Sequence, residues 1–314
     1  MAGDVNLNSA TVSQPDIVQL DKFPSRSLWS EAIRHIRRDR LTLFAFSILT
    51  LLTLVCVFLP PVVEETLGVS ATRTNVIDRY KAPGVDNYVL GTDALGRDQL
   101  TRLLYGGRVS LGVAYGASLM SITIGVFIGM VAGFYGGLID DVVNSFIAIL
   151  SSIPTLFLLI LVSVIFSPTP QMLVILLGLL GWITTCRLVR GEVLALKERE
   201  FIVAAQSLGA SSRQLLWRHL LPNIISLVIV TLTIDAGSLI LIESGLSYLG
   251  LGVRPPTPSW GNMLTDARSS LATGQHLIIW PGIMIFVTVL CFFLVGDGLR
   301  DALDPRRKHK EAKE

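Results

Sequence analysis

Charged side chains are scarce in this chain. Asp, Glu, Lys and Arg together make up 16% of its 314 residues, whereas hydrophobic residues make up 51%. Soluble globular domains carry about 25% charged residues, so this composition excludes an ordinary water-soluble protein and favours a membrane-embedded one. The formal net charge is only +2, and the positions of the charges are therefore more informative than their sum.

Cysteine and histidine are also rare. The three cysteines, Cys56, Cys186 and Cys291, lie in or beside apolar runs and have no paired spacing. The sequence therefore predicts neither a disulfide framework nor a thiolate metal site. The four histidines are scattered along the chain, and we expect no metal site in this polypeptide.

Motifs for ATP binding and for hydrolase catalysis are missing as well. The sequence contains no Gly-x-x-x-x-Gly-Lys-Ser/Thr phosphate loop, no Gly-x-Ser-x-Gly turn and no His-Glu-x-x-His helix. We therefore expect a chain that is not an enzyme and has no catalytic residues or cofactor of its own. If it takes part in active transport, the energy must come from a separate subunit.

Long apolar runs dominate the rest of the sequence. A bilayer core about 30 Å thick requires roughly 20 apolar residues of helix. Six runs approach that length, which predicts an all-α integral membrane protein with six transmembrane helices. The predicted spans cover residues 41–59, 109–134, 142–166, 172–189, 224–249 and 277–295.

The basic residues predict the orientation. With both termini in the cytoplasm, eighteen of the 26 Lys and Arg residues fall on the cytoplasmic side, as the positive-inside rule requires. The first 27 residues are polar, and we expect a disordered cytoplasmic tail there rather than a cleaved signal. Residues 60–107 are then an extracytoplasmic loop, and residues 298–314 a basic cytoplasmic tail.

Residues 28–40 have an amphipathic pattern. Apolar side chains from Leu28 to Ile36 fall within one arc of about 140° on a helical wheel, opposite Glu31, Arg34 and Arg37. This pattern predicts an interfacial helix on the inner leaflet. A basic signal that only sets the orientation is the alternative, and the two can coexist.

The longest polar segment between two spans covers residues 190–222. Ala204, Ala205 and Gly209 lie at helical spacing, and their small side chains let another surface approach closely. Gly209 permits a backbone turn that other residues resist. An ordinary amphipathic connector between two spans is the alternative interpretation.

The second half of this segment has the signals of another helix. Ser211 and Ser212 supply an N-cap for a short helix that runs through Leu221. Pro222 then fits the first turn of the fifth span.

Residues 201–222 closely resemble the "EAA" loop of bacterial ABC-importer permeases, the part that docks into the ATPase. In that family Glu-Ala-Ala is followed after three residues by Gly, and then by a run that ends in Leu-Pro. Val203 stands where the family has Glu, and Glu200, one turn earlier, is the candidate replacement. The resemblance implies that the ATPase-coupling residues are Ala204, Ala205, Leu208, Gly209, Ala210, Arg213, Leu221 and Pro222.

Three further blocks, residues 90–111, 243–264 and 296–305, resemble the oligopeptide/dipeptide permease C type of peptide and nickel importers. Together the matches run from Leu90 to Pro305. The resemblance implies the type I ABC importer permease fold, with a permease core over residues 108–297. It also implies a bacterial or archaeal cytoplasmic membrane as the location.

The same resemblance implies the function and the partners. The chain is expected to be one permease of an ATP-driven, binding-protein-dependent importer for dipeptides, oligopeptides or a similar small solute. Its implied partners are a second permease of the B type, two ATP-binding subunits that hold ATP and Mg²⁺, and an extracytoplasmic solute-binding protein. Dipeptides, longer peptides, nickel chelates and glutathione-like molecules all stay open as substrates.

Two sequence features concern helix geometry. Gly125, Gly129 and Gly133 lie four residues apart in the second span, a spacing typical of close helix packing in lipid. Pro154 interrupts the third span and predicts a kink, for which we expect a structural role rather than a gating one.

The fifth span contains the carboxylates Asp235 and Glu243. A charge at that depth costs on the order of several kcal/mol unless it is paired, protonated or hydrated. One hypothesis places both residues, with Ser244, beside a water-filled pathway; the alternative gives Glu243 a packing hydrogen bond. A secondary transporter driven by an ion gradient through these two carboxylates is the competing function. A membrane enzyme is disfavoured, because no paired catalytic groups converge at one depth.

Overall fold

The computed structural model describes residues 28–166, 168–268 and 274–303. Within these ranges the chain is helical and contains no strand. The predicted tail 1–27 and most of the predicted tail 298–314 lie outside the described residues. The helices are α1 (Leu28–Arg38), α2 (Arg40–Leu67), η1 (Val76–Asp78), α3 (Gln99–Tyr135), α4 (Gly137–Ser151), α5 (Thr155–Phe166), α6 (Pro170–Lys197), α7 (Glu200–Ser207), α8 (Ser212–Gln214), η2 (Leu215–Leu220), α9 (Leu221–Tyr248), α10 (Trp260–Arg268) and α11 (His276–Leu303).

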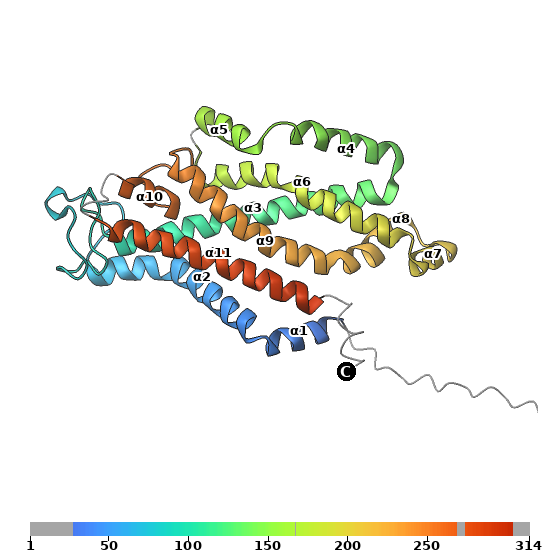
Figure 1. Cartoon of the computed structure of the whole chain (residues 1–314), viewed down its shortest axis with the longest axis horizontal. Coiled ribbons are helices and arrows are strands. Elements are labelled where there is room, and N and C mark those ends of the chain that lie inside the picture. The colour runs from blue at the N-terminus through green and yellow to red at the C-terminus, as the bar shows by residue number, and fades with distance from the viewer. Residues whose placement is uncertain (1–27, 167, 269–273, 304–314) are drawn as a thin grey trace, which may run out of the picture.

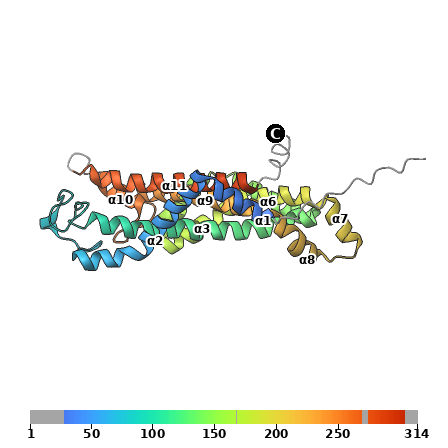
Figure 2. The same cartoon turned by 90° about the horizontal axis from the view of Figure 1, so that it is seen from below.

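The long helices form an elongated bundle (Figure 1). The helix α1 and the short helices α7 and α8 lie toward one end of it. The loop between α2 and α3 and the helix α10 lie at the other end, in both views (Figures 1 and 2). The helix α1 and the short helices α7 and α8 thus lie in the same half of the molecule, with α7 and α8 at its extremity.

Five described helices are long and apolar enough to cross a membrane, and a bent pair makes a possible sixth span. The pair consists of α4 and α5, which meet at an angle of 73°. The predicted span 142–166 is therefore not one straight helix. Pro154 lacks a backbone N–H and disfavours the α conformation of the preceding residue, so α4 ends at Ser151 and α5 starts at Thr155.

The helices reach beyond the predicted spans because they continue into water. The helix α2 runs to Leu67, and Pro60 and Pro61 lie within it. The helix α3 begins at Gln99, where the Asp98 carboxylate accepts a hydrogen bond from the Thr101 amide at 2.7 Å. Residues 68–98 are therefore the part of the predicted loop 60–107 that connects these two helices.

The predicted interfacial helix corresponds to α1, which contacts α11 and α2. Arg34, Arg37 and Arg38 are exposed, and Ile36 is partly buried. The side chains of residues 28–32 lie outside the described part of the chain. The place of α1 on the inner leaflet stays a prediction.

The closest helix contact joins α3 to α6 through the predicted glycine stripe. A Cβ atom at Gly125, Gly129 or Gly133 would lie 2.6–2.9 Å from Thr185 or from a backbone carbonyl oxygen of α6. The carbonyl oxygens are those of Trp182, Cys186 and Arg190, at 2.8, 2.7 and 2.9 Å. The two backbones can approach this closely only because the glycines have no side chains.

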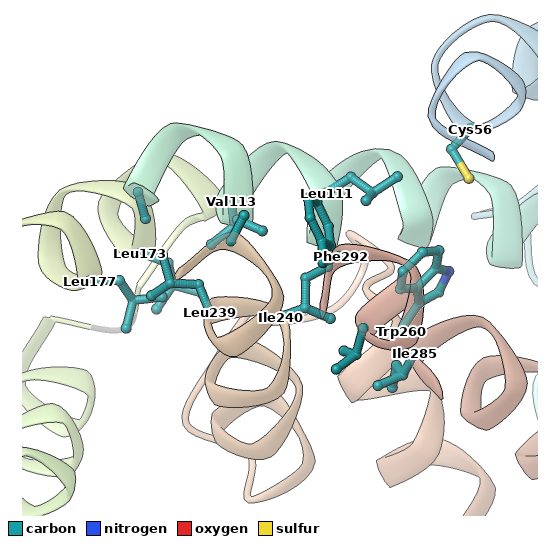
Figure 3. Close-up of a cluster of buried hydrophobic side chains, with 14 of the residues drawn as sticks. Cys56, Leu111, Val113, Leu173, Leu177, Leu239, Ile240, Trp260, Ile285 and Phe292 are labelled. Atoms are coloured by element: carbon teal, nitrogen blue, oxygen red, sulfur yellow. The ribbon is translucent and has the colours of Figure 1, made fainter. Parts of the chain in front are cut away.

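The main core lies between these helices and the other spans (Figure 3). Val113 of α3 points toward Leu239 of α9, and Phe292 of α11 lies between Leu111 and Ile240. The helix α10 was not predicted, because no apolar periodicity marks its nine residues. Its Trp260 is fully buried in this core and donates an indole N–H hydrogen bond to the Leu103 carbonyl at 3.0 Å.

Salt bridges connect α10 to the start of α3 and to the loop before it. Asp266 of α10 accepts from Arg97 at 3.1 Å and from Arg102 at 2.9 Å. The Asp93 carboxylate also forms ion pairs with both arginines, at 2.7 Å from Arg97 and 3.4 Å from Arg102. Residues 90–98 thus position two buried arginines. Gly91 and Gly96 adopt positive φ angles, which glycine tolerates in tight turns.

We predict that Gly129→Val destabilises the bundle by about 1–3 kcal/mol, because the added side chain would overlap the α6 backbone. The thermal unfolding midpoint of the detergent-purified protein measures this. Gly112→Val is the matched control, since the same helix has open space at Gly112. Equal unfolding midpoints for the two variants would contradict the close packing.

Candidate functional site

The predicted coupling segment folds into a compact elbow, defined here as residues 200–220. It starts with α7, whose C-terminus carries a Schellman motif: the Gly209 amide donates to the Gln206 carbonyl at 2.9 Å and the Ala210 amide to the Ala205 carbonyl at 3.0 Å. Gly209 has a φ angle of +86°, which only glycine adopts without strain. The chain reverses direction here because Gly209 ends α7.

The second half of the elbow leads directly into α9. The Ser211 hydroxyl caps α8 by accepting from the Gln214 amide at 3.3 Å, as predicted. The helix then widens into a π-helical turn, η2, before α9 begins with Pro222 in its first turn. A proline ring clashes with the carbonyl four residues earlier in an α-helix, and a wider turn before Pro222 relieves that clash.

Buried apolar side chains anchor the elbow to the bundle. Ile202 of α7 and Leu215 and Leu220 of η2 are almost completely buried. They belong to one cluster with Val189 and Val193 of α6, and this cluster continues to α3 and to the first turn of α9. A displacement of the elbow is therefore transmitted to the ends of α6 and α9.

Polar contacts strengthen the same end of α6. The Lys197 ammonium donates to the carbonyl of Phe134, the penultimate residue of α3, at 2.8 Å. Arg190 forms an ion pair with Asp140 of α4, with Nη2 donating to Oδ2 at 2.6 Å. These contacts connect the end of α6 that precedes the elbow to α3 and α4.

The opposite face of the elbow is exposed and partly apolar. Leu208 is 89% exposed, and Phe201, Val203 and Trp217 are also exposed. Two hollows of about 390 and 370 Å³ lie on this surface. They are lined by Ala205, Leu208, Gly209, Ala210, Ser211, Arg213, Gln214, Trp217, Arg218 and His219.

Most of the predicted coupling residues lie on this exposed face. Ala204, Leu208, Gly209 and Arg213 are exposed, and Ala205 and Ala210 are partly buried at the rim. Leu221 instead packs against the inner cluster, and Pro222 belongs to the first turn of α9. Whether these residues touch an ATPase stays a prediction.

Sequence reasoning did not single out the anchors Ile202, Leu215 and Leu220, nor the exposed Trp217. The apolar anchors are spread over two short helices and a π turn, so no single helical period links them. Val203 is exposed on the elbow, and Glu200 is exposed one turn before it.

The pathway candidate Glu243 lies in a cage of serines. Its side chain is 0% exposed, and it accepts hydrogen bonds from the hydroxyls of Ser110 on α3 at 2.9 Å and Ser247 at 2.7 Å. Ser244, the third pathway candidate, is also buried, with its hydroxyl 3.5 Å from the Glu243 carboxylate. The Trp260 amide in turn donates to Ser110 at 3.2 Å.

These contacts join α3, α9 and the start of α10 through one carboxylate. The Glu243 side chain lies within the chain's own core and does not border an open channel in this conformation. Of the two interpretations of Glu243, the geometry therefore favours the packing hydrogen bond.

Asp235 is separate from this cage. It lies eight residues earlier on α9, which corresponds to about 12 Å along the helix, and it is only partly buried. Its carboxylate faces the hydroxyl of Ser121 on α3. The structure therefore does not bring the two predicted pathway carboxylates together.

Replacement of Glu243 separates packing from a pathway role. We predict that Glu243→Ala destabilises the protein by about 2 kcal/mol or more, because two buried hydroxyls lose their acceptor. Glu243→Gln keeps an acceptor and a similar shape, so assembly and transport should stay close to wild type. Yield and unfolding midpoint of the purified protein, together with uptake by the assembled transporter, measure these effects.

Ser238→Ala is the control for Glu243, since the Ser238 hydroxyl bonds only to the Ile234 carbonyl of its own helix. A Glu243→Gln variant that assembles normally but transports poorly would contradict the packing role.

Comparison with known proteins decides the family. Residues 125–309 match the family described as binding-protein-dependent transport system inner membrane component. Residues 27–83 match the N-terminal transmembrane domain of oligopeptide transport permease C. The chain belongs to the binding-protein-dependent transport permease family.

Full-length relatives support this assignment. The oligopeptide transport system permease protein OppC of Haemophilus influenzae is 37% identical over 297 residues, which cover 93% of each chain. The dipeptide transport system permease protein DppC of Alkalihalophilus pseudofirmus is 35% identical and covers 92% of this chain and 93% of the relative. The glutathione transport system permease protein GsiD of Pectobacterium atrosepticum is 39% identical over 74% of this chain and 77% of the relative.

The resemblance inferred from the motifs is thus confirmed. This permease is a non-catalytic, multi-pass subunit of an ABC transporter in the bacterial cytoplasmic membrane. Family membership supports binding-protein-dependent transport and not the ion-gradient-driven alternative.

Proposed function

We propose that this permease forms half of the translocation pathway of an importer for dipeptides, oligopeptides or a similar small solute. The support for this solute class comes from its relatives, which are named as oligopeptide, dipeptide and glutathione permeases. These solutes share a peptide backbone or a peptide-like one. A peptide is therefore the solute class that the relatives have in common.

The proposed complex contains a second, B-type permease, two ATP-binding subunits and an extracytoplasmic solute-binding protein. ATP and Mg²⁺ are held by the ATP-binding subunits, because this chain has no phosphate-binding loop. We expect the second permease to cover apolar side chains of α4 and α5. Phe146, Phe157, Leu161 and Ile165 of these helices are all exposed in the isolated chain.

The elbow is the proposed site of energy coupling, and its two-sided construction is the observation that carries this proposal. One side is buried against α6 and α9, and the other presents exposed apolar side chains and two hollows. An ATP-binding subunit that grips the exposed side moves the ends of both helices together. Alternation between inward- and outward-open states then follows from the motion of α6 and α9.

This mechanism has a minimum energy requirement. A shift of the two populations from 1:99 to 99:1 needs about 5.5 kcal/mol of differential binding. That amount has to come from ATP binding at the partner subunits. This chain contributes the mechanical connection.

We predict that Gly209→Asp abolishes transport and ATPase stimulation but leaves membrane insertion intact. An aspartate at Gly209 strains the backbone and adds a charge to the exposed turn, yet it meets no atom within 4 Å. Uptake, ATPase activity and co-purification of the ATP-binding subunits measure the effect.

Gly84→Asp is the control for Gly209, because Gly84 has a similar φ angle of +81° and equally open surroundings at the other end of the molecule. It should retain the ATP-binding subunits. Transport by the Gly209→Asp variant at the wild-type rate would refute the coupling assignment.

The solute class has its own test. We predict that a di- or oligopeptide raises the unfolding temperature of the purified solute-binding protein of this transport system, because ligand binding stabilises the folded state. A thermal-shift screen with dipeptides, longer peptides, glutathione and nickel chelates measures this. A shift with nickel chelates alone would rule out the peptide assignment.

A further inference from the structure

The loop between α2 and α3 exposes apolar side chains at its tip. Val76 and Ile77 of η1 are 67% and 91% exposed, and Leu95 is 45% exposed. Leu95 lies beside η1 because the Asn75 amide donates to the Leu95 carbonyl at 3.0 Å. We call Val76, Ile77 and Leu95 the outer patch.

The outer patch lies away from the predicted bilayer. The apolar part of α2 is followed by Glu64 and Glu65 before the helix ends at Leu67, so the loop starts on the water side of these carboxylates. The loop projects past the ends of α2, α3 and α10 along the long axis of the bundle (Figures 1 and 2). Contact with lipid tails therefore does not account for the exposed apolar side chains.

The patch is also held in a fixed shape. The Asp78 carboxylate accepts hydrogen bonds from the side-chain amide of Asn75 at 2.6 Å and from the Tyr88 hydroxyl at 2.9 Å. It also forms an ion pair with Lys81 at 2.5 Å. Gly96 packs so closely that a Cβ atom there would lie 1.8 Å from the Asn75 carbonyl oxygen. A preorganised apolar surface loses little conformational entropy when it is bound.

Positive charge flanks the patch. Arg73 and Arg79 lie on either side of η1 in the sequence, and both are exposed. Neither guanidinium forms an ion pair among the described residues, whereas Lys81 is paired with Asp78 and Asp86. A complementary partner therefore offers an apolar pocket with acidic groups at its rim.

We propose that the outer patch is an anchor point for the extracytoplasmic solute-binding protein. The family is defined by its dependence on such a protein, and this patch is a rigid, water-facing, partly apolar surface at the predicted outer end. Three side chains are too few for a whole interface, but a few buried apolar anchors carry much of the binding energy in many complexes. The inference rests on the proposed function, which supplies the solute-binding protein as a partner.

The test measures binding of the purified solute-binding protein to the complete transporter in lipid nanodiscs. Ile77→Asp should weaken binding by about tenfold or more, whereas the matched variant Ile77→Leu, which keeps the apolar contact, should bind like wild type. Arg73→Gln combined with Arg79→Gln should also weaken binding and reduce its dependence on salt. Wild-type affinity for Ile77→Asp would overturn the proposal.

A labelling experiment distinguishes a protein partner from the lipid surface. Ile77→Cys can be labelled selectively, because the three native cysteines are buried. A fluorophore at this position should be quenched by aqueous iodide and protected when the solute-binding protein is added. Quenching by lipid-borne nitroxides instead would overturn the proposal in favour of membrane contact.

Failure of this inference can be told apart from failure of the proposed function. If only the outer patch is wrong, the wild-type transporter still binds the solute-binding protein and all Ile77 variants bind equally. If the proposed dependence on a solute-binding protein is wrong, the wild-type transporter binds no such protein at all.

Discussion

The contact on which the structure depends is the close approach of α3 and α6. Lipid tails are as apolar as the side chains on the surface of a membrane helix, so the hydrophobic effect does not drive such helices together. Packing between them therefore relies on complementary shape. The stripe of Gly125, Gly129 and Gly133 lets α3 lie directly on the α6 backbone. The helix α3 also contacts α2, α9 and α10, and its fixed position against α6 therefore sets the geometry of the bundle.

The two ends of the bundle are stabilised by different interactions. At the elbow end, an apolar cluster around Ile202 and Leu220 joins the short helices to α6 and α9. At the other end, polar contacts join the helices in addition to the apolar core: Asp266 binds Arg97 and Arg102, and Glu243 binds Ser110 and Ser247. A movement that starts at the elbow can pass along α6 and α9 to α3 and from there to α10.

Several local features were predictable because neighbouring residues dictate them. Pro154 breaks the third span through its own ring, Gly209 reverses the chain because it tolerates a positive φ angle, and Ser211 caps the next turn. The role of Glu243 was left open between two hypotheses. Its partner Ser110 lies 133 residues away in sequence, and no local pattern connects them. For the same reason α10, which depends on the burial of Trp260, was not predicted.

The sequence by itself determined the class of protein: apolar runs of membrane length, basic residues gathered in particular segments, and the motif blocks that place the chain among binding-protein-dependent permeases. It did so because these signals are local or compositional. Only the tertiary structure decided which face of the elbow is anchored and which is exposed, and that Glu243 is enclosed rather than open to a channel. Both depend on helices far apart in sequence that bury one another's side chains.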